Sequence, residues 1–381
     1  MSKTRKNIKY KRKRYKRKTI RINNYFFQAP NLTPISIRKI SNKMLKNGSY
    51  SPTINENLIT LKSIGRKKLL DCNTSIAYKF KEPLQINVNG KCYNYYTQEA
   101  QQFLLKNLAA NKHINTDIIV PPIQSQSNCW FNAMFVTFFV SDKGRKFFHF
   151  LRQLMIEGKQ QDGTAIPNGL RDAFALLNFG IDACLTGNDY AYKLNTNSII
   201  HILYKSIPNS YKKNYPFIVD IDEAGNPLLY YFGIINYLHN SSIQMLLIRD
   251  VKNGGWKDEI SKYVHQMGHM PHIIVLEIYD EDASVFNKKP ISFSVLDAKY
   301  EIDSAVVRDI SKQHFCSMIT CEGKEMGYDG ASFHRLVPLK WKNNMNTNMD
   351  WGFDGTEESK GVSMKWNFTK SYQLLMYYRV K

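Results

Sequence analysis

The order of the apolar patterns along the chain constrains its fold more than any other feature. From Asn128, apolar residues recur at spacings of three and four, which is typical of helices that bury one face. From residue 215, short runs rich in Ile, Val, Tyr and Phe follow one another, separated by Gly, Asn, Asp and Pro, which is typical of strands. Helices followed by strands predict an α+β fold rather than a doubly wound parallel sheet.

The same patterns give approximate ranges for the elements. We expect helices over residues 97–112, 128–140, 146–157, 168–179 and 195–206. We expect strands within residues 59–64, 217–222, 227–238, 242–250, 272–280, 291–296, 300–307, 314–320, 325–333 and 371–381.

Length and cysteine usage narrow the class of protein. With 381 residues, of which 43% are hydrophobic, the chain can bury a large core. Its six cysteines do not suggest a disulfide framework in a chain of this length, and its first residues are basic rather than apolar. The longest apolar runs are about eight residues, far short of the roughly 20 that span a bilayer. We therefore expect a soluble protein of a reducing intracellular compartment, without membrane contact.

The net charge of +21 is concentrated at the N-terminus. Residues 1–22 contain 12 Lys and Arg residues and no acid, so like charges repel one another and we expect a disordered tail. Such a tail can bind nucleic acid, because neutralised phosphates release counterions, or it can bind a nuclear import receptor. A solvated arm that only improves solubility is the alternative.

The segment QSNCWFNA, residues 126–133, places one cysteine where a polar loop gives way to a helical pattern. A cysteine in an intracellular chain is most often a small buried residue without reactivity. At a helix N-terminus, however, unpaired backbone amides and the helix dipole stabilise the thiolate, which is the nucleophilic form. Cys129 fits that position. Gln124 and Asn128, just upstream, are candidates for the side-chain amide that binds an oxyanion.

A nucleophilic cysteine needs a base, and His314 is the strongest candidate among the nine histidines. It opens the strand-like run HFCSMIT, and a second strand-like run at hairpin distance carries Asp329. Adjacent antiparallel strands can bring a His and an Asp side by side, so that the Asp orients the ring and stabilises the imidazolium. The sequence therefore indicates a triad of Cys129, His314 and Asp329. Cys316 lies on the same face of the strand and is expected to be a core residue.

The cluster HQMGHMPH, residues 265–272, suggests a metal site at first sight. Gly268 and Pro271 interrupt any helix there, and the Glu of an HExxH motif is absent. We expect neither a metal nor a cofactor.

Five blocks in the same order resemble the ubiquitin-specific proteases, the papain-like deubiquitinases, over about residues 115–381. SNCWFNA matches the Cys, the following aromatic and the Asn three residues on in the cysteine box of that family. QHF at 313–315 and GYD at 327–329 match its histidine box, although Gln313 replaces the usual glycine. The runs PHIIVLEIYD, YEIDSAVV and SYQLLMYYRVK match its flanking strands.

This resemblance implies a papain-like cysteine peptidase, with a helical lobe that carries the Cys followed by an antiparallel β lobe that carries the His and the Asp. It implies a thiol-dependent deubiquitinase, which hydrolyses the peptide or isopeptide bond after the C-terminal Gly of ubiquitin or a ubiquitin-like protein. Acids at the rim of the substrate channel would suit the arginines of the ubiquitin tail, and the candidates are Asp220, Asp222 and Glu223. The chain then divides into the tail (1–22), an N-terminal extension of mixed structure (23–114) and the catalytic domain (115–381).

Two other functions stay open. A papain-like protease could mature viral or structural precursor proteins without acting on ubiquitin. The wealth of Asn, Ile, Lys and Tyr suggests an AT-rich genome, such as that of a giant virus or a protist, and the basic tail would suit a nucleus, virion or virus factory. The third possibility is a catalytically dead nucleic-acid-binding or virion protein on the same fold.

Overall fold

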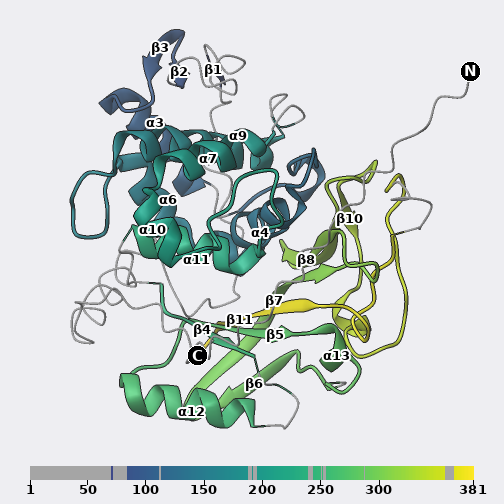
Figure 1. Ribbon diagram of the computed structural model, residues 1–381. Coiled ribbons are helices and arrows are strands. Elements are labelled where there is room, and N and C mark those ends of the chain that lie inside the picture. The colour runs from purple at the N-terminus through teal and green to yellow at the C-terminus, as the bar shows by residue number, and fades with distance from the viewer. Residues whose placement is uncertain are drawn as a thin grey trace, which may run out of the picture.

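The computed structural model describes residues 70–71, 84–110, 113–187, 191, 195–238, 243–249, 251, 255–286, 288–356 and 364–381. The basic tail and the strand expected at 59–64 lie outside these residues. Most helices gather in an upper lobe, and the main sheet lies below them in a second lobe (Figure 1).

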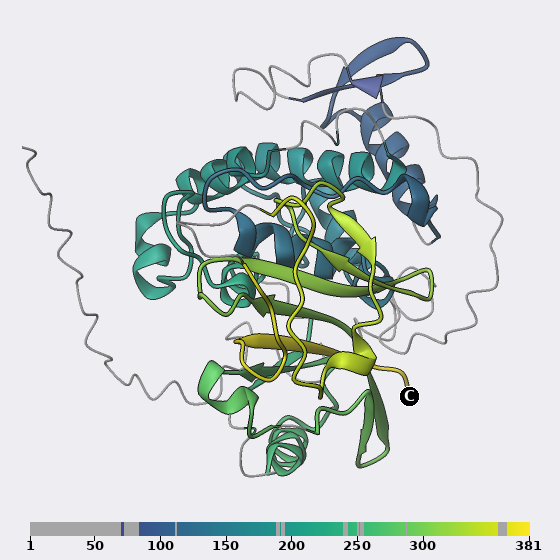
Figure 2. The ribbon, with the colours of Figure 1, turned by 90° about the vertical axis from the view of Figure 1, so that its right-hand side faces the viewer.

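The helical lobe follows the predicted helical half of the chain. It consists of α3 (Gln98–Ala110), η1 (Thr116–Ile118), α4 (Cys129–Phe139), α5 (Asp142–Phe147), α6 (His149–Glu157), α7 (Asn168–Thr186), α9 (Asn197–Ser206), α10 (Asn209–Asn214) and α11 (Pro227–Tyr237). A small antiparallel sheet of β1 (Leu70–Asp71), β2 (Gln85–Val88) and β3 (Lys91–Asn94) lies at the end of this lobe that is remote from the main sheet (Figure 2).

The β lobe contains the main sheet of the described residues. Its strands are β4 (Met245–Ile248), β5 (Ile273–Ile278), β6 (Ser292–Val295), β7 (Ala298–Arg308), β8 (Phe315–Cys321), β9 (Lys324–Tyr328), β10 (Leu336–Pro338) and β11 (Gln373–Arg379). Around the sheet lie α12 (Trp256–Met267), α13 (Asp280–Ala283) and η2 (Lys342–Asn344).

The strand order is β10-β9-β8-β7-β11-β5-β4, and β6 pairs with β7 beside this path. All neighbouring strands are antiparallel except β4 and β5, which are parallel. The lobe is therefore a mixed sheet, and the prediction of a purely antiparallel lobe was wrong at this edge. The chain crosses from β4 to β5 through α12, and such a crossover is what parallel neighbours require.

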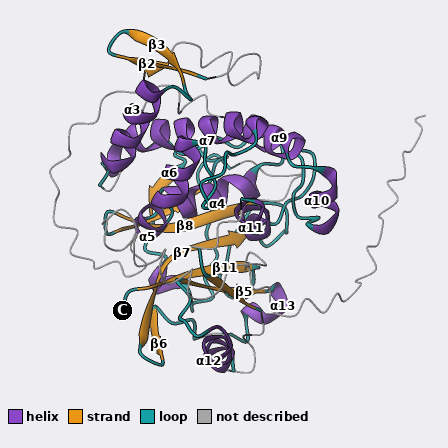
Figure 3. Ribbon diagram, turned by 90° about the vertical axis from the view of Figure 1, so that its left-hand side faces the viewer, coloured by secondary structure: helices purple, strands orange, loops and turns teal. Residues whose placement is uncertain are grey.

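Successive side chains along each strand point to opposite faces of the sheet, and both faces are apolar. On β11, Leu374 and Met376 join the core shared with the helices, while Leu375 and Tyr377 join a second core on the other face. Helix α12 contributes Trp256, Ile260 and Tyr263 to the second core, and in Figure 3 it lies on the side away from the helical lobe. A sheet covered on both faces explains why these strands read as nearly continuous apolar runs.

Helix α4 is the element that connects the two lobes at their centre. All of its residues from Cys129 to Phe139 are buried, because it packs against other helices on one side and against β7 and β8 on the other. The start of α4 is thereby fixed relative to the strand that follows His314.

Three predicted elements differ from the structure. Residues 227–238 form the helix α11 instead of a strand, and residues 217–222 form no strand. The side chain of Asn226 accepts the backbone N–H groups of Leu228 and Leu229, and Pro227 occupies the first turn, so the helix start is well capped. Because nearly all of α11 is buried, its apolar residues show no helical period. The single helix expected over 146–157 is broken at Phe148 into α5 and α6.

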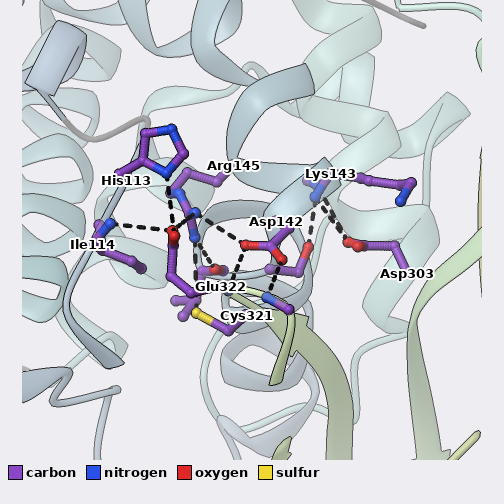
Figure 4. Close-up of polar contacts among 12 residues, drawn as sticks. His113, Ile114, Asp142, Lys143, Arg145, Asp303, Cys321 and Glu322 are labelled. Carbon is purple, nitrogen blue, oxygen red and sulfur yellow. Dashed lines mark hydrogen bonds and ion pairs between the residues drawn. The ribbon is translucent and has the colours of Figure 1, made fainter. Parts of the chain in front are cut away.

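A buried polar network fixes the β8–β9 turn to the helical lobe (Figure 4). The Arg145 guanidinium on α5 donates to the carboxylates of Asp142, at 3.1 Å, and of Glu322 in the turn, at 2.6 Å. Glu322 also accepts the backbone N–H of Ile114 at 3.1 Å, and Asp142 accepts the N–H of Glu322 at 2.7 Å. The closed end of this hairpin is thus held by ion pairs, and His314 and Asp329 lie at its open end.

Cys129, Cys184, Cys316 and Cys321 are free and buried, whereas Cys92 on β3 is disulfide-bonded. Among the described helices, none combines the length and the apolar character needed to cross a bilayer.

Candidate active site

Cys129 is the first residue of α4, and only 8% of it is exposed. The loop before it is held by amide side chains. Asn128 accepts the Ser125 N–H at 3.1 Å and donates to the Thr196 hydroxyl at 3.1 Å. That hydroxyl donates in turn to Asn132, three residues after Cys129, at 2.5 Å. These bonds fix the point at which α4 begins, so Cys129 lies beside the unpaired N–H groups of the first helical turn.

His314 directly precedes β8, and Asp309 fixes its backbone. The buried Asp309 carboxylate accepts the N–H of His314 at 2.7 Å and that of Gln313 at 2.6 Å. The Asp309 N–H donates to the His314 carbonyl at 2.7 Å. The turn over residues 309–314 therefore sets the direction of the His314 side chain.

Asp329 directly follows β9, the strand paired with β8. Its Oδ1 lies 2.6 Å from Nε2 of His314, and both side chains are almost completely buried. The Trp366 ring lies edge-on to the imidazole, with ring centroids 5.7 Å apart. The hairpin thus places His314 and Asp329 side by side, in the way that two antiparallel strands allow.

His314 and Asp329 each stabilise the charged form of the other. Burial alone would lower the pKa of His314, but its hydrogen bond with Asp329 and the nearby Cys129 side chain outweigh burial and raise that pKa to about 10. Nδ1, the ring nitrogen that Asp329 does not use, has no hydrogen-bond partner among the described residues. Burial would raise the pKa of Asp329, but the hydrogen bonds from His314 and Thr356 hold it below its usual value. His314 is therefore protonated at neutral pH, between an ionised Asp329 on one side and the Cys129 side chain on the other.

Cys316 is fully buried in the second core of the sheet. Burial raises the pKa of its thiol well above the usual value, so this sulfur stays protonated and unreactive.

Cys129 lines a cleft of about 610 Å³ between the lobes. The helical side of the cleft includes Trp130, Asp222 and residues 224–227. Gly225 lies so close to the Trp130 ring that a Cβ there would be 2.4 Å from it. The sheet side includes Glu277 and Tyr372, which are joined by a 2.7 Å hydrogen bond. Residues of both lobes therefore line the cleft, and a substrate bound in it can reach Cys129.

Of the two predicted oxyanion residues, Gln124 lines this cleft and Asn128 does not. The Gln124 N–H donates to the Gly330 carbonyl at 2.9 Å, and a Cβ on Gly330 would lie 2.9 Å from the Gln124 nitrogen. The loop of Gln124 is thus packed directly on the turn that follows Asp329. The Gln124 Oε1 atom is buried and has no hydrogen-bond partner among the described residues. Asn128 uses its side chain to hold the loop.

The three predicted rim acids lie in different settings. Asp222 is exposed and lines the cleft. Asp220 is paired with His201, with Oδ2 and Nδ1 3.0 Å apart, and it does not line the cleft. Glu223 is exposed outside the cleft lining, and its N–H donates to the Asp220 carbonyl.

The sequence reasoning missed Asp309, Thr356 and Trp366. An Asp followed two residues later by a Ser is a turn signal, so Asp309 could have been found. Thr356 and Trp366 lie in a stretch without helical or strand periodicity, and nothing local marks them. Over the described residues, no group of three His, Cys, Asp or Glu side chains is arranged to hold a metal ion.

Comparison with known proteins gives only distant matches. No family model and no curated protein sequence matches the chain. Among solved structures, the SAGA DUB module Ubp8/Sgf11/Sus1/Sgf73 bound to monoubiquitin matches with a TM-score of 0.42 and 9% identity, over 91% of this chain and 95% of the other. The same module bound to ubiquitin aldehyde matches with a TM-score of 0.42 and 9% identity, over 91% of this chain and 94% of the other. A further structure of the SAGA Ubp8/Sgf11/Sus1/Sgf73 DUB module gives a TM-score of 0.34 and 10% identity, over 91% of this chain and 94% of the other. The function is therefore argued from the site itself.

Proposed function

We propose that the chain is a papain-like cysteine peptidase, in which Cys129 is the nucleophile, His314 the acid–base group and Asp329 the group that orients it. One observation carries this proposal: the His314 ring is bonded through Nε2 to the Asp329 carboxylate, and the Cys129 side chain, at a helix N-terminus, lies near enough to the ring to raise its pKa. Nucleophile, base and orienting group in this mutual arrangement are what acyl transfer requires.

In the proposed reaction, the Cys129 thiolate attacks the carbonyl carbon of the scissile bond. The protonated His314 gives its proton to the leaving amine, which departs and leaves a thioester on Cys129. His314 then takes a proton from water, and the resulting hydroxide equivalent attacks the thioester. The acid product leaves, the thiolate forms again, and His314 is protonated once more.

Gln124 is the proposed oxyanion residue, because it lines the cleft beside Cys129 and its loop is fixed by Gly330. Replacement by Ala is expected to lower turnover about 100-fold or more with little change in substrate binding, since the amide would act only on the charge that develops in the transition state. Separate measurement of kcat and KM checks this. Asn128→Ala is the comparison: it should lower the melting temperature, because it breaks the loop network. A defect of Gln124→Ala confined to KM would contradict the assignment.

We infer that the substrate is ubiquitin or a ubiquitin-like protein. The support is the order of the five sequence blocks, and a cleft that carries the exposed Asp222 at its rim, where an arginine of a substrate tail can reach it. Reaction with a ubiquitin that carries a C-terminal electrophile tests this. If the probe does not react while a small thiol reagent labels Cys129 selectively, maturation of viral or structural precursors is the better function. If neither reagent reacts, the chain is a catalytically dead protein.

The basic tail is proposed to act separately from the catalytic domain, in binding nucleic acid or an import receptor. Deletion of residues 1–22 is expected to leave the probe reaction nearly unchanged, because the triad lies far along the chain. It is expected to abolish salt-sensitive binding to DNA or RNA, or nuclear accumulation, since 12 basic residues are removed. Binding at low and high salt, with the full chain in parallel, measures the first effect. Lost catalysis with unchanged binding and location would contradict the separation.

A further inference from the structure

The Asp329 carboxylate has partners besides His314. The Thr356 hydroxyl donates a hydrogen bond to Oδ2, the oxygen that His314 does not use. The Ala331 N–H donates to Oδ1 at 3.0 Å, next to the bond with His314. Asp329 has no exposed surface, so bulk water does not reach Oδ2. Thr356 is therefore the group that solvates this oxygen.

Thr356 is fixed by a tight turn that packs on the loop of Asp329. Its N–H donates to the Phe353 carbonyl, and Gly355 within the turn has a φ of +84°, a conformation that favours glycine. A Cβ on Gly355 would also lie 2.4 Å from the Phe333 ring. The Phe333 N–H donates to the Asp354 carbonyl at 2.9 Å, so the two loops are joined.

The same turn reaches the imidazole through aromatic rings. Phe353 packs edge-on against Trp366, with centroids 5.3 Å apart, and Trp366 packs against His314. Residues 353–356 therefore support both members of the His–Asp pair, the ring through Trp366 and the carboxylate through Thr356.

We propose that Thr356 is a positioning residue, which keeps Asp329 ionised and aimed at His314. Its relevance to catalysis rests on the function proposed above. A hydrogen bond to a charged group is stronger than one between neutral groups, and a buried charged oxygen without a partner is costly. Without the hydroxyl, Asp329 takes up a proton at a higher pH. A neutral Asp329 no longer balances the imidazolium, so the charged pair is lost earlier on the acidic side.

The test is a pH titration of the His314 ring by NMR, on full-length protein labelled with ¹³C at histidine. The variants are Thr356→Val, which keeps the shape and removes the hydroxyl, and Thr356→Ser, which keeps the hydroxyl. The resonance of His314 is identified by its absence in His314→Gln. In the wild type, this resonance reports the protonation of Asp329 at low pH, and in Thr356→Val that step is expected about one pH unit higher.

Thr356→Ser is expected to titrate as the wild type does. Thr347→Val, which removes an exposed threonine hydroxyl bonded to the Asn344 carbonyl, is the matched control and should not move the step. Coincident titrations of Thr356→Val and the wild type would overturn the proposal, and so would an equal shift in Thr356→Ser. The electrophilic ubiquitin probe, applied to the same proteins, separates the two hypotheses. A shifted titration without any adduct in the wild type rejects ubiquitin as the substrate and leaves the role of Thr356 intact. An adduct with an unshifted titration rejects the role of Thr356 alone.

Discussion

A ubiquitin that carries a C-terminal electrophile is expected to form one covalent adduct with the wild-type chain and none with Cys129→Ala. His314→Ala is expected to slow the reaction by several orders of magnitude, because the imidazolium that stabilises the thiolate is lost. The raised pKa of His314, to which the nearby Cys129 contributes, is the reason to expect so large an effect. A gel shift and an intact mass one probe heavier measure it.

Cys184→Ala is the matched control, because Cys184 is also free and buried but does not line the cleft. Burial raises the pKa of its thiol, so it should contribute nothing to the adduct. An adduct that persists in Cys129→Ala would show that the nucleophile lies elsewhere.

Asp329→Ala is expected to lower turnover roughly 10⁴-fold, the size of the loss seen when the orienting acid of a triad is removed. Asp329→Asn should lose much less, because its amide oxygen can still accept the Nε2–H of His314, as the Asn of papain-like triads does. The measurement is kcat for both variants at several pH values.

The pH profile separates orientation from charge. The pKa of His314 is raised to about 10, against about 6.5 for an unperturbed histidine. The stabilisation from the charged pair is thus complete below about 6.5 and is lost as the pH rises through about 10. The neutral amide in Asp329→Asn would orient the ring but not stabilise its charge, so the alkaline limb of the profile should move to lower pH in this variant. An unmoved limb, or equal losses in both variants, would contradict this role of the Asp329 charge.

The parts of the site that the sequence could predict are those set by local patterns. A polar loop followed by apolar residues at helical spacing marks the start of α4, and hence the position of Cys129. Two strand-like runs at hairpin distance mark β8 and β9, and hence bring His314 close to Asp329. In both cases a local pattern, helical for Cys129 and strand-like for His314 and Asp329, is enough to place the side chain.

The parts that could not be predicted depend on contacts between segments far apart in sequence. Thr356 reaches Asp329 across 27 positions, and Trp366 reaches His314 from outside any strand of the main sheet. The sequence predicts a strand over residues 227–238, where the structure has α11, because burial on nearly all sides removes the period by which a helix is recognised. The parallel pairing of β4 and β5 also depends on tertiary packing, because an apolar run in the sequence does not show in which direction the neighbouring strand runs.

Strand β11 is the last strand of the described chain, yet it lies in the middle of the sheet, between β7 and β5. During synthesis, the strands on its two sides are made first and have no ladder that joins them. The sheet can close only after residues 373–379 have left the ribosome, and until then β7 and β5 present open edges to other chains. The hairpin of His314 and Asp329 can form early, but its lobe becomes a single body only after β11 has paired with both β7 and β5.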